Sequence, residues 1–566
     1  MLVATRSLPK TAHSRLADWS ADPSTDVLVV GGGINGLAVF RELALQGVKV
    51  TLVDKADYCS GASAASSHMI HGGIRYLENG EIRLVRESLL ERNRLLATAP
   101  HFVKPLKTTI PIFSLFSGIL SAPFKIFTHR SGKPTERGAA LIKIGLILYD
   151  TFGRNGGRMP RHQFFGRKKT MATIPGINDR VKYSAHYYDA AIENPERLAI
   201  DLLQDGLAAG PHARAANYVS ASAHHDGHTT LTDELTGETL DMSATVVVNT
   251  SGPWTDLTNH ALGVDSHYMG GTKGSHVVLD NPELHAVCNG REIFFENKDG
   301  RIVLMYPLLD RVLLGTTDIP VDDPNDVECT EEEVDYFFDL VGYVFPDITL
   351  DRSHIVYRYS GVRPLPAAGD VNPGVISRDY RIVRDPLDQE TTMLSLVGGK
   401  WTTFRAIGEH ITDDVLAELG RERTVGTAEL AIGGGAGFPT SDSERDKWVS
   451  AHATGLDPER ALELLKRYGT VAAEIIGLMD HDSDHALEHT ADYSVEEIRA
   501  VVNREQVHTL SDLVFRRTTL GFTGGISPRS LAELAHIIGD VRGWSAQELD
   551  RQVSSIPLER SLTDDS

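Results

Sequence analysis

A glycine-rich turn with the spacing G-x-G-x-x-G is the first feature of the sequence that could do chemistry. Its glycines, Gly31, Gly33 and Gly36, follow the apolar run of residues 26–30 and precede a helix-like run. The first glycine allows a tight turn, the second lets a pyrophosphate approach the backbone, and the third lets the helix pack on the strand. Asp54 ends the next apolar run, where an acid accepts ribose hydroxyls and repels a 2′-phosphate. The pattern predicts a βαβ unit that binds FAD or NAD and disfavours NADP.

A second stretch, residues 66–85, places paired serines, two histidines, a Gly-Gly pair and an arginine before a helix-like run. The small residues, which include Ser66 and Ser67, indicate that a large group lies against the backbone. The guanidinium of Arg75 offers a planar, bidentate partner for an anion. The stretch therefore predicts a site where a bulky ligand and an anion lie close together.

The whole chain has the composition of a soluble globular enzyme, with 566 residues, of which 41% are hydrophobic and 23% charged. Its formal net charge of -21 disfavours nucleic acid as a general partner. Three cysteines without paired spacing suit a reducing compartment and disfavour a disulfide framework. No stretch approaches the roughly 20 apolar residues of a spanning helix, so we expect a cytoplasmic protein whose contact with any membrane is peripheral.

Strand-like and helix-like runs predict a long mixed part and a shorter helical part. Residues 1–22 are expected to be a flexible leader, and 23–425 an α/β unit in which a nucleotide-binding core is interleaved with a substrate-binding part. The segment 426–440, with the sequence GGGAG, is expected to be a flexible linker. From 441 to 566 the periodicity is helical, which predicts an α-helical C-terminal domain.

A set of longer motifs resembles the FAD-dependent glycerol-3-phosphate dehydrogenases, a family of glycine-oxidase-like flavoproteins. They occur in family order over about residues 26–419: GGGINGLA, ASSHMIHGGIRYLENGEIRLVRESLLERNRLLATAPHFVKP, YDTFG, NTSGPWTD, KGSHVVL, GTTDIP, YSGVRPL, SRDYRI and SLVGGKWTTFRAIGEH. TLSDLVFRRTTLGF resembles the family's helical C-terminal domain. The resemblance implies a Rossmann-type FAD-binding domain with a mixed-sheet substrate domain. It also implies oxidation of sn-glycerol 3-phosphate to dihydroxyacetone phosphate, with electrons passed to a membrane quinone.

By this resemblance, Arg75 and Arg363 grip the substrate phosphate and Arg378 assists. Removal of the hydroxyl proton, as hydride leaves the same carbon, needs a base with a pKa near the working pH, which favours histidine. His276 and His71 are equal candidates, and the sequence does not choose between them.

Asp318, in the motif GTTD, could orient the base or the substrate hydroxyls, but it could equally cap a turn. Its role therefore stays open at the level of sequence.

The resemblance also assigns residues to the flavin. Ser66 and Ser67 can hydrogen-bond a flavin edge, and the Gly-Gly pair after His71 lets the backbone pass close to a flat ring. Gly252 is expected against the cofactor. The motif VGGKWTTF, which contains Gly399, Lys400 and Thr402, predicts a strand, a turn and a helix. The helix N-terminus and Lys400 would stabilise the negative charge of the reduced flavin.

Three departures from the family pattern stand out. His68 occupies the place of the usual lysine beside the flavin, where it could alter the reduction potential; covalent attachment is not expected. Asp54 is a shorter acid than the usual glutamate. The sequence NPERL at residues 194–198 replaces the usual Asp-Ala-Arg, so Arg197 receives no function.

Residues 104–169 carry thirteen Lys and Arg and two acids, about +11 in a chain of net -21. With the apolar run IPIFSLFSGILSAPFKIF inside it, this stretch predicts contact with an anionic membrane, which would bring a quinone to the flavin. A buried loop near the active site is the alternative. The polar run 480–489 is better explained as a helix-capping loop than as a metal site.

Three alternative functions remain open: an oxidase of glycerol 3-phosphate that uses O2, an amine or amino-acid oxidase of the same fold, and a catalytically silent FAD-binding protein that docks on membranes. A homo-oligomer is the expectation for the assembly.

Overall fold

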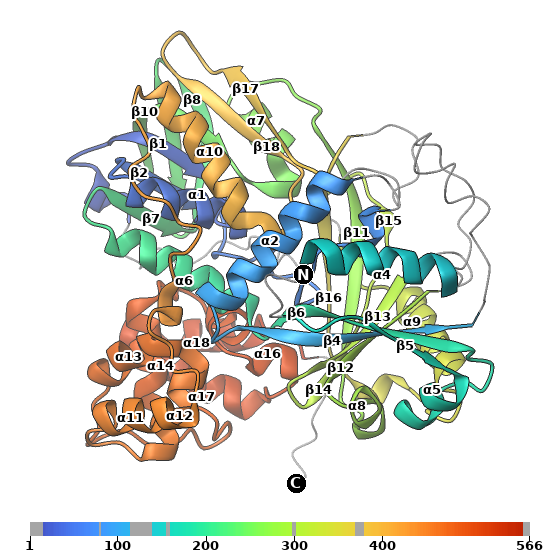
Figure 1. The fold of residues 1–566 in the computed structure, drawn as a ribbon. Helices are drawn as coiled ribbons and strands as arrows, with labels where there is room; N and C mark the ends of the chain where they lie inside the picture. Colours follow the sequence, from blue (N-terminus) through green and yellow to red (C-terminus); the bar gives the residue numbers. More distant parts are fainter. Residues whose placement is uncertain are drawn as a thin grey trace.

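The computed structural model describes residues 15–77, 81–113, 139–153, 159–296, 302–325, 327–367 and 378–558. Figure 1 shows two sheet-containing layers and a separate group of helices built from the C-terminal part of the chain. None of the helices in these ranges is long and apolar enough to cross a bilayer.

The first sheet has, among the described residues, eight strands around a parallel centre. β1 lies between β10 and β2, β18 extends the sheet beyond β10 and β7 beyond β2, and all these pairings are parallel. The antiparallel strands β17, β8 and β9 complete it. The bounds are β1 (Ser24–Val30), β2 (Val50–Asp54), β7 (Ala213–Asn217), β8 (Val219–His225), β9 (His228–Asp233), β10 (Thr239–Asn249), β17 (Arg381–Pro386) and β18 (Thr392–Val397).

Helices cover this sheet because its central strands are apolar on both sides. In β1, Val27, Leu28 and Val29 are fully buried, as expected for a parallel strand packed on both faces. The helices α1 (Ile34–Leu45), α6 (Pro195–Ala208) and α10 (Phe404–Glu418) contribute to the core on one face. The predicted βαβ unit is therefore confirmed.

The second sheet is mixed and, within the described ranges, has ten strands. Its order is β15-β11-β14-β13-β12-β4-β6-β3, with β16 paired to β11 and β5 to β6. The bounds are β3 (Met69–Ile70), β4 (Val103–Ile112), β5 (Gln163–Gly166), β6 (Tyr183–Ile192), β11 (Met269–Leu279), β12 (Arg291–Glu296), β13 (Ile302–Leu308), β14 (Arg311–Gly315), β15 (Ile319–Pro320) and β16 (Ile355–Pro366).

The remaining α-helices among the described residues before position 430 lie between or beside the sheets. They are α2 (Ile82–Thr98), α4 (Ala139–Gly153), α5 (Arg167–Thr173), α7 (Thr255–Ala261), α8 (Pro282–Cys288) and α9 (Glu331–Val344). The chain alternates between the two sheets, which confirms the expected interleaving of a Rossmann-type part with a mixed-sheet part.

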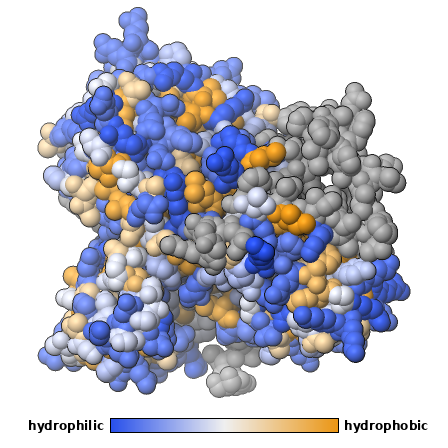
Figure 2. All heavy atoms as spheres, viewed as in Figure 1, coloured by the Kyte–Doolittle hydropathy of each residue, from blue (hydrophilic) through white to orange (hydrophobic). Residues whose placement is uncertain are grey.

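The C-terminal part is helical and has its own hydrophobic core. Its helices are α11 (Asp442–His452), α12 (Pro458–Tyr468), α13 (Ala472–Leu478), α14 (Val495–Arg504), α15 (Leu510–Asp512), α16 (Leu520–Thr523), α17 (Pro528–Arg542) and α18 (Ala546–Ser554). Figure 2 shows hydrophobic residues scattered among hydrophilic ones on the drawn face of this part, as expected when the apolar faces point inward.

Two segments expected to be loose are packed. Leu16 and Trp19 are buried against the first sheet, and Arg15 Nη2 donates to Asp233 Oδ1 at 2.9 Å, so residues 15–22 do not belong to a flexible leader. In the GGGAG sequence, Gly434 and Gly435 are buried. A Cβ on Gly434 would lie 2.1 Å from a backbone oxygen. These glycines serve close packing, whereas the sequence alone indicated flexibility.

Candidate functional site

Four turns lie at the same edge of the first sheet, each just after a parallel strand. Gly31 follows β1, Asp54 ends β2, Gly252 follows β10, and Gly399 follows β18. In open α/β sheets, ligands bind outside the carboxyl ends of the strands. The predicted cofactor residues are therefore brought to one edge by the strand order.

The glycine turn after β1 leaves no room for side chains. Gly31 has a positive φ of 108°, and a Cβ there would lie 2.7 Å from the carbonyl oxygen of Thr250. A Cβ on Gly36 would lie 1.8 Å from the carbonyl oxygen of Gly31. The helix α1 thus packs directly on the turn, which is the role expected of the third glycine.

The N-cap residue of α1 is Gly33, which has no side chain to cap the helix, although Ser63 Oγ accepts a hydrogen bond from Ile34 N at 3.0 Å. A helix N-terminus attracts anions through its free N–H groups and its dipole, so this end suits a pyrophosphate. Asp54 lies beside it and accepts hydrogen bonds from Gly32 N at 2.6 Å and Ala56 N at 2.8 Å. Burial raises the pKa of Asp54 to about 6. Each carboxylate oxygen keeps a second lone pair with which to accept a ribose hydroxyl.

A second helix N-terminus approaches the first. Gly398 and Gly399 have positive φ values of 86° and 113°, and the chain then enters a 3-10 turn and α10. A Cβ on Gly399 would lie 3.3 Å from Nδ2 of Asn35, in the first turn of α1. The Oδ1 atom of Asn35 is buried without a hydrogen-bond partner among the described residues. The two glycine turns therefore face one another, with an unsatisfied acceptor between them.

Lys400 and Thr402 both donate to the backbone carbonyl of His71. The distances are 2.5 Å from Lys400 Nζ and 3.3 Å from Thr402 Oγ1. Burial, with the positive charges of Arg92 and Arg378, lowers the pKa of Lys400 to about 7, although Asp189 opposes the shift. Lys400 therefore fixes the 71–73 turn and is poised to change charge near neutral pH.

The Gly-Gly pair is required by protein packing. A Cβ on Gly72 would lie 2.5 Å from the hydroxyl of Tyr149, and a Cβ on Gly73 2.3 Å from the ring of Tyr76. Gly72 N donates to the Tyr149 hydroxyl at 2.9 Å, and that hydroxyl donates to Asp189 Oδ1 at 2.5 Å. The sequence reading, in which these glycines make room for a flat ring, missed this contact. Tyr149 belongs to the motif YDTFG, which could have drawn attention to this tyrosine from the sequence.

The pairing of β11 with β16 assembles the predicted phosphate site. Arg363 lies opposite Thr272, and a Cβ on Gly274 would lie 2.3 Å from Arg363 Nη2, so Gly274 makes room for the guanidinium. Arg363 Nη1 donates to Asp318 Oδ1 at 3.0 Å, and Arg378 Nη2 lies 3.6 Å from Asp318 Oδ2. The structure thus places Asp318 between the two arginines.

A buried glutamate that sequence reasoning missed supports this site from the other face of β11. Glu333 accepts hydrogen bonds from Lys273 Nζ and Ser275 Oγ, both at 2.8 Å, and from Thr317 Oγ1 at 2.6 Å. Thr317 precedes Asp318. Glu333 also completes a capping box with Thr330 at the start of α9, and the T-x-x-E spacing was the signal that could have identified it.

His276 lies on the Arg363 face of β11, in register with Tyr359, on which its ring stacks at 4.9 Å. Its Nε2 lies 2.8 Å from Ser67 Oγ, and its Nδ1 is buried without a hydrogen-bond partner among the described residues. Burial, together with the charges of Arg363 and His68, lowers the pKa of His276 to about 3. The imidazole is therefore neutral at neutral pH, the form that accepts a proton.

The other predicted residues of the 66–75 stretch fall into different environments. The Ser66 carbonyl accepts the Tyr359 hydroxyl at 2.7 Å. The ring of His68 is buried against Phe522, and burial lowers the pKa of His68 to about 4.

His71 is half-buried, with its ring 6.4 Å from that of Tyr76. Arg75 lies in the 3-10 turn Ile74–Leu77, and its side chain falls outside the described residues.

These features fit a flavin dinucleotide. The glycine turn, which carries no side chains of its own, and the N-terminus of α1 suit the pyrophosphate, and Asp54 suits a ribose. Gly252 has a φ of 64°, and a Cβ there would meet no atom of the described residues within 4 Å, which leaves space on that side. Arg363 and the neutral His276 lie on strands of the second sheet, and Arg378 lies in the chain that leads into β17 of the first. The site therefore combines a dinucleotide cradle with an anion-binding face.

Comparisons with known proteins agree with this geometry. A family model described as "FAD dependent oxidoreductase" matches residues 26–413, and one described as "C-terminal domain of alpha-glycerophosphate oxidase" matches residues 425–549. The chain is 33% identical to the glycerol-3-phosphate dehydrogenase of Synechocystis sp., covering 93% of this chain and 95% of the relative.

Two further similarities bear on substrate and fold. The chain is 30% identical to D-erythritol 1-phosphate dehydrogenase of Brucella abortus, over 88% of this chain and 95% of the relative. Its fold matches a crystal structure of glycerol-3-phosphate dehydrogenase from Bacillus halodurans complexed with FAD, with a TM-score of 0.72, 21% identity and 97% coverage of both chains.

Proposed function

The chain belongs to the FAD-dependent oxidoreductase family, and from this premise we propose that it oxidises sn-glycerol 3-phosphate to dihydroxyacetone phosphate. The observation that carries the proposal is the arrangement of Arg363, Asp318 and Arg378 beside His276. Two guanidinium groups on one carboxylate provide charge and directed donors for a phosphate dianion. The names of the relatives supply the substrate class.

Each side chain has a role in this proposal. Arg363 and Arg378, with Arg75, hold the phosphate, and Asp318 orients the two guanidinium groups that flank it. His276 takes the hydroxyl proton on a ring nitrogen, because it shares a face of β11 with Arg363. Its lowered pKa keeps the ring neutral in the empty site, and the negative charge of a bound phosphate would raise that pKa toward the working pH that a base needs. Bound FAD supplies the two-electron acceptor for the hydride that leaves the same carbon.

Lys400 and the N-terminus of α10 provide positive potential at the cofactor.

We favour His276 over His71 as the base. His276 shares a strand face with Arg363, which would hold the substrate, whereas the backbone carbonyl of His71 is tied to Lys400 and Thr402. His71 remains the comparison residue for mutagenesis.

The test is an anaerobic titration of the purified holoenzyme followed by visible absorption. Glycerol 3-phosphate should bleach the oxidised flavin band, while glycerol and glycine should not. An unchanged spectrum with glycerol 3-phosphate would reject the substrate and leave the family intact. Bleaching by glycine would instead support an amino-acid oxidase.

D-Erythritol 1-phosphate is the second candidate substrate, because one relative at 30% identity is named for its oxidation. The two compounds share a phosphate and a polyol, so the same arginines would bind either. The ratio of their kcat/KM values decides between them, and a ratio in favour of the four-carbon substrate would change the assignment.

For the electron acceptor we propose a membrane quinone, reached from an anionic bilayer surface through the basic stretch 104–169. Residues 114–138 and 154–158 of that stretch lie outside the described residues. Within the described part, Ile147 on α4 is 49% exposed and Met171 on α5 is 36% exposed, beside Lys143 and the Arg167–Lys169 cations. Apolar side chains flanked by cations support interfacial binding.

The acceptor is tested separately from the substrate. Cosedimentation with vesicles that contain anionic lipid, against neutral vesicles, tests membrane binding. Reduction of a soluble quinone analogue, compared with hydrogen peroxide release in air, distinguishes a dehydrogenase from an oxidase. Rapid peroxide release with no quinone reduction would reject the quinone.

A further inference from the structure

The C-terminal helical part contacts the cofactor-binding edge of the first sheet through a short segment, residues 54–59. This segment begins at the ribose-side acid Asp54 and ends at Cys59, whose N–H donates to the carbonyl of Gly32 at 2.9 Å. The ring of Tyr58 packs on the glycine turn, since a Cβ on Gly32 would lie 2.8 Å from Tyr58 Cδ1. The 54–59 segment therefore packs directly against the glycine turn.

Asp57, in the middle of this segment, is held by two consecutive arginines of the C-terminal part. Arg517 Nη1 and Nη2 donate to its two carboxylate oxygens, both at 2.9 Å, and Arg516 Nε also donates to Oδ2. Asn217 Nδ2, from β7, donates to Oδ1 at 2.7 Å. Asp57 and Arg517 are both fully buried as side chains. Burial alone would raise the pKa of Asp57, but the charges of Arg517 and Arg516 hold it below its ordinary value.

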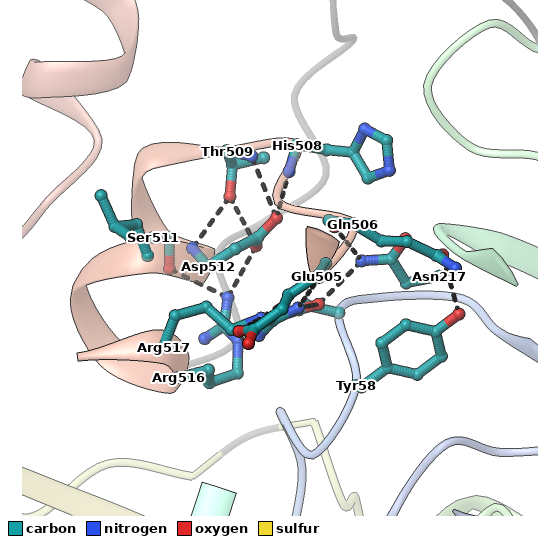
Figure 3. Close-up of polar contacts among 12 residues, drawn as sticks. Tyr58, Asn217, Glu505, Gln506, His508, Thr509, Ser511, Asp512, Arg516 and Arg517 are labelled. Carbon is teal, nitrogen blue, oxygen red and sulfur yellow. Dashed lines mark hydrogen bonds and ion pairs between the residues drawn. The ribbon is translucent and has the colours of Figure 1, made fainter. Parts of the chain in front are cut away.

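A second contact joins the same two parts beside the first. The Tyr58 hydroxyl donates to Gln506 Oε1 at 3.0 Å, and Gln506 Nε2 donates to the carbonyl of Ala215 in β7 at 3.2 Å. Figure 3 shows Tyr58 pointing toward Gln506 and Asn217, with Arg516 and Arg517 lying below Asp512. Asp57 and Tyr58 are thus both held by side chains of the C-terminal part.

We propose that docking of the C-terminal part and binding of FAD are coupled through the 54–59 segment, with Asp57 as the positioning residue that transmits the coupling. A buried carboxylate that loses its cationic partners is destabilised until it is solvated or protonated, and solvation would draw the segment toward water. Such a movement displaces Tyr58 from Gly32 and shifts Asp54, three residues earlier, away from Gly32 N. The glycine turn and the ribose acid would then lose the geometry that binds the dinucleotide.

Coupling between two binding events is reciprocal, which supplies a second, independent readout. If an intact interface favours FAD binding, then FAD must favour the intact interface by the same factor. The inference rests on FAD as the cofactor and does not depend on which phosphorylated polyol is the substrate.

The first experiment is the Arg517→Met variant of the full chain. FAD is removed from wild type and variant, and the dissociation constant is measured by quenching of FAD fluorescence on reconstitution. We expect FAD to bind about tenfold more weakly to the variant, within the range of typical couplings. An unchanged dissociation constant in a folded R517M protein would overturn the proposal.

The matched control is Arg197→Met. Arg197, on α6, makes a buried ion pair with Glu505 at the same interface, Nη2 to Oε1 at 3.0 Å, but does not contact the 54–59 segment through any hydrogen bond of the described residues. Glu505 is also a partner of Arg517, whose Nε and Nη2 donate to its carbonyl, so FAD affinity should fall in R197M by much less than in R517M. An equal loss in R197M would show general loosening of the interface and would also overturn the proposal.

If R517M does not fold, the proposal is tested by the FAD affinity of Tyr58→Phe and by hydrogen exchange in the wild-type protein. Tyr58→Phe removes only the hydroxyl that contacts Gln506, and FAD should bind about two- to threefold more weakly, the low end of the effect of one neutral hydrogen bond. In wild type, FAD should slow amide hydrogen exchange at residues 505–517 relative to the apoprotein. If FAD leaves exchange in that range unchanged while protecting residues 31–36, the two events are not coupled.

Discussion

Asp318 accepts a hydrogen bond from Arg363, with Oδ1 and Nη1 3.0 Å apart. The carboxylate and the guanidinium belong to different elements, the turn after β14 and the strand β16, and the register of β11 with β16 brings them together. Because Arg378 approaches the other oxygen, Asp318 fixes both cations in one place. This arrangement gives the first prediction.

Arg363→Met should raise KM for glycerol 3-phosphate by more than about tenfold, since a charge-assisted hydrogen bond contributes roughly 1.5–3 kcal/mol. Arg363→Lys should recover only part of the loss, because an ammonium group lacks the bidentate geometry. Arg358→Met is the control, since Arg358 lies on the same strand but pairs with Glu331. Steady-state kinetics provide the measurement, and equal KM values for R363M and R358M would contradict the assignment.

His276→Gln should lower kcat by about 10²-fold or more, the usual contribution of a general base, with a small effect on KM. The side chain is neutral because burial holds its pKa near 3, so glutamine preserves the charge of the free site. His71→Gln should lower kcat much less. The opposite order for the two variants would make His71 the base.

Lys400→Met should lower the reduction potential of bound FAD at pH 6. The pKa of Lys400 lies at about 7, so the ammonium is present below pH 7 and is lost as the pH rises through that value. A decrease of about 30 mV corresponds to a tenfold change for a two-electron couple. The difference between wild type and variant should shrink by pH 9, as followed by spectroelectrochemistry.

Lys400→Arg is the matched control for that measurement. Arginine keeps its charge throughout the range, so its potential at pH 9 should exceed that of wild type. A potential that is identical in all three proteins at both pH values would remove Lys400 from the cofactor site.

Glu292 in β12 should make the folded protein less stable as the pH rises. Burial raises its pKa from 4.5 to about 8, and it accepts a hydrogen bond from Thr108 Oγ1 at 2.7 Å. Between pH 4.5 and 8 the folded state therefore holds a proton that the unfolded state has lost, and stability falls across that window. The upper limit of the loss is roughly 5 kcal/mol, at 1.36 kcal/mol per pKa unit.

Glu292→Gln should remove this loss, because glutamine can still accept the hydrogen bond without ionising. The variant should melt at a higher temperature than wild type at pH 9 and at a similar temperature at pH 5. Glu332→Gln, on the exposed start of α9, should show no such difference. Similar melting temperatures of E292Q and wild type at pH 9 would contradict the raised pKa.

The sequence by itself determined the features that depend on local chain geometry. A strand, a G-x-G-x-x-G turn and a helix are contiguous, so steric demands at Gly31 and Gly36 are visible in the residue types. The same holds for the turn at Gly399 before α10 and for the helical periodicity after residue 441. Family motifs then identified Arg363, Arg378 and His276 as candidates for the site.

Only the tertiary structure decided how distant residues meet, because burial and strand register are not local properties. Gly274 makes room for Arg363 only once β11 pairs with β16, and Glu333 supports the turn before Asp318 only once α9 packs on that sheet. Asp57 meets Arg517 across 460 positions of sequence.

Glycines show the same contrast between what the sequence and the tertiary structure determine. Gly433–Gly435 of the GGGAG segment and the Gly72–Gly73 pair resemble flexible or ligand-facing sequence, yet neighbouring backbone and side chains fill the space where their Cβ atoms would be. A glycine reports that a side chain is excluded, and only the folded chain shows which atoms exclude it.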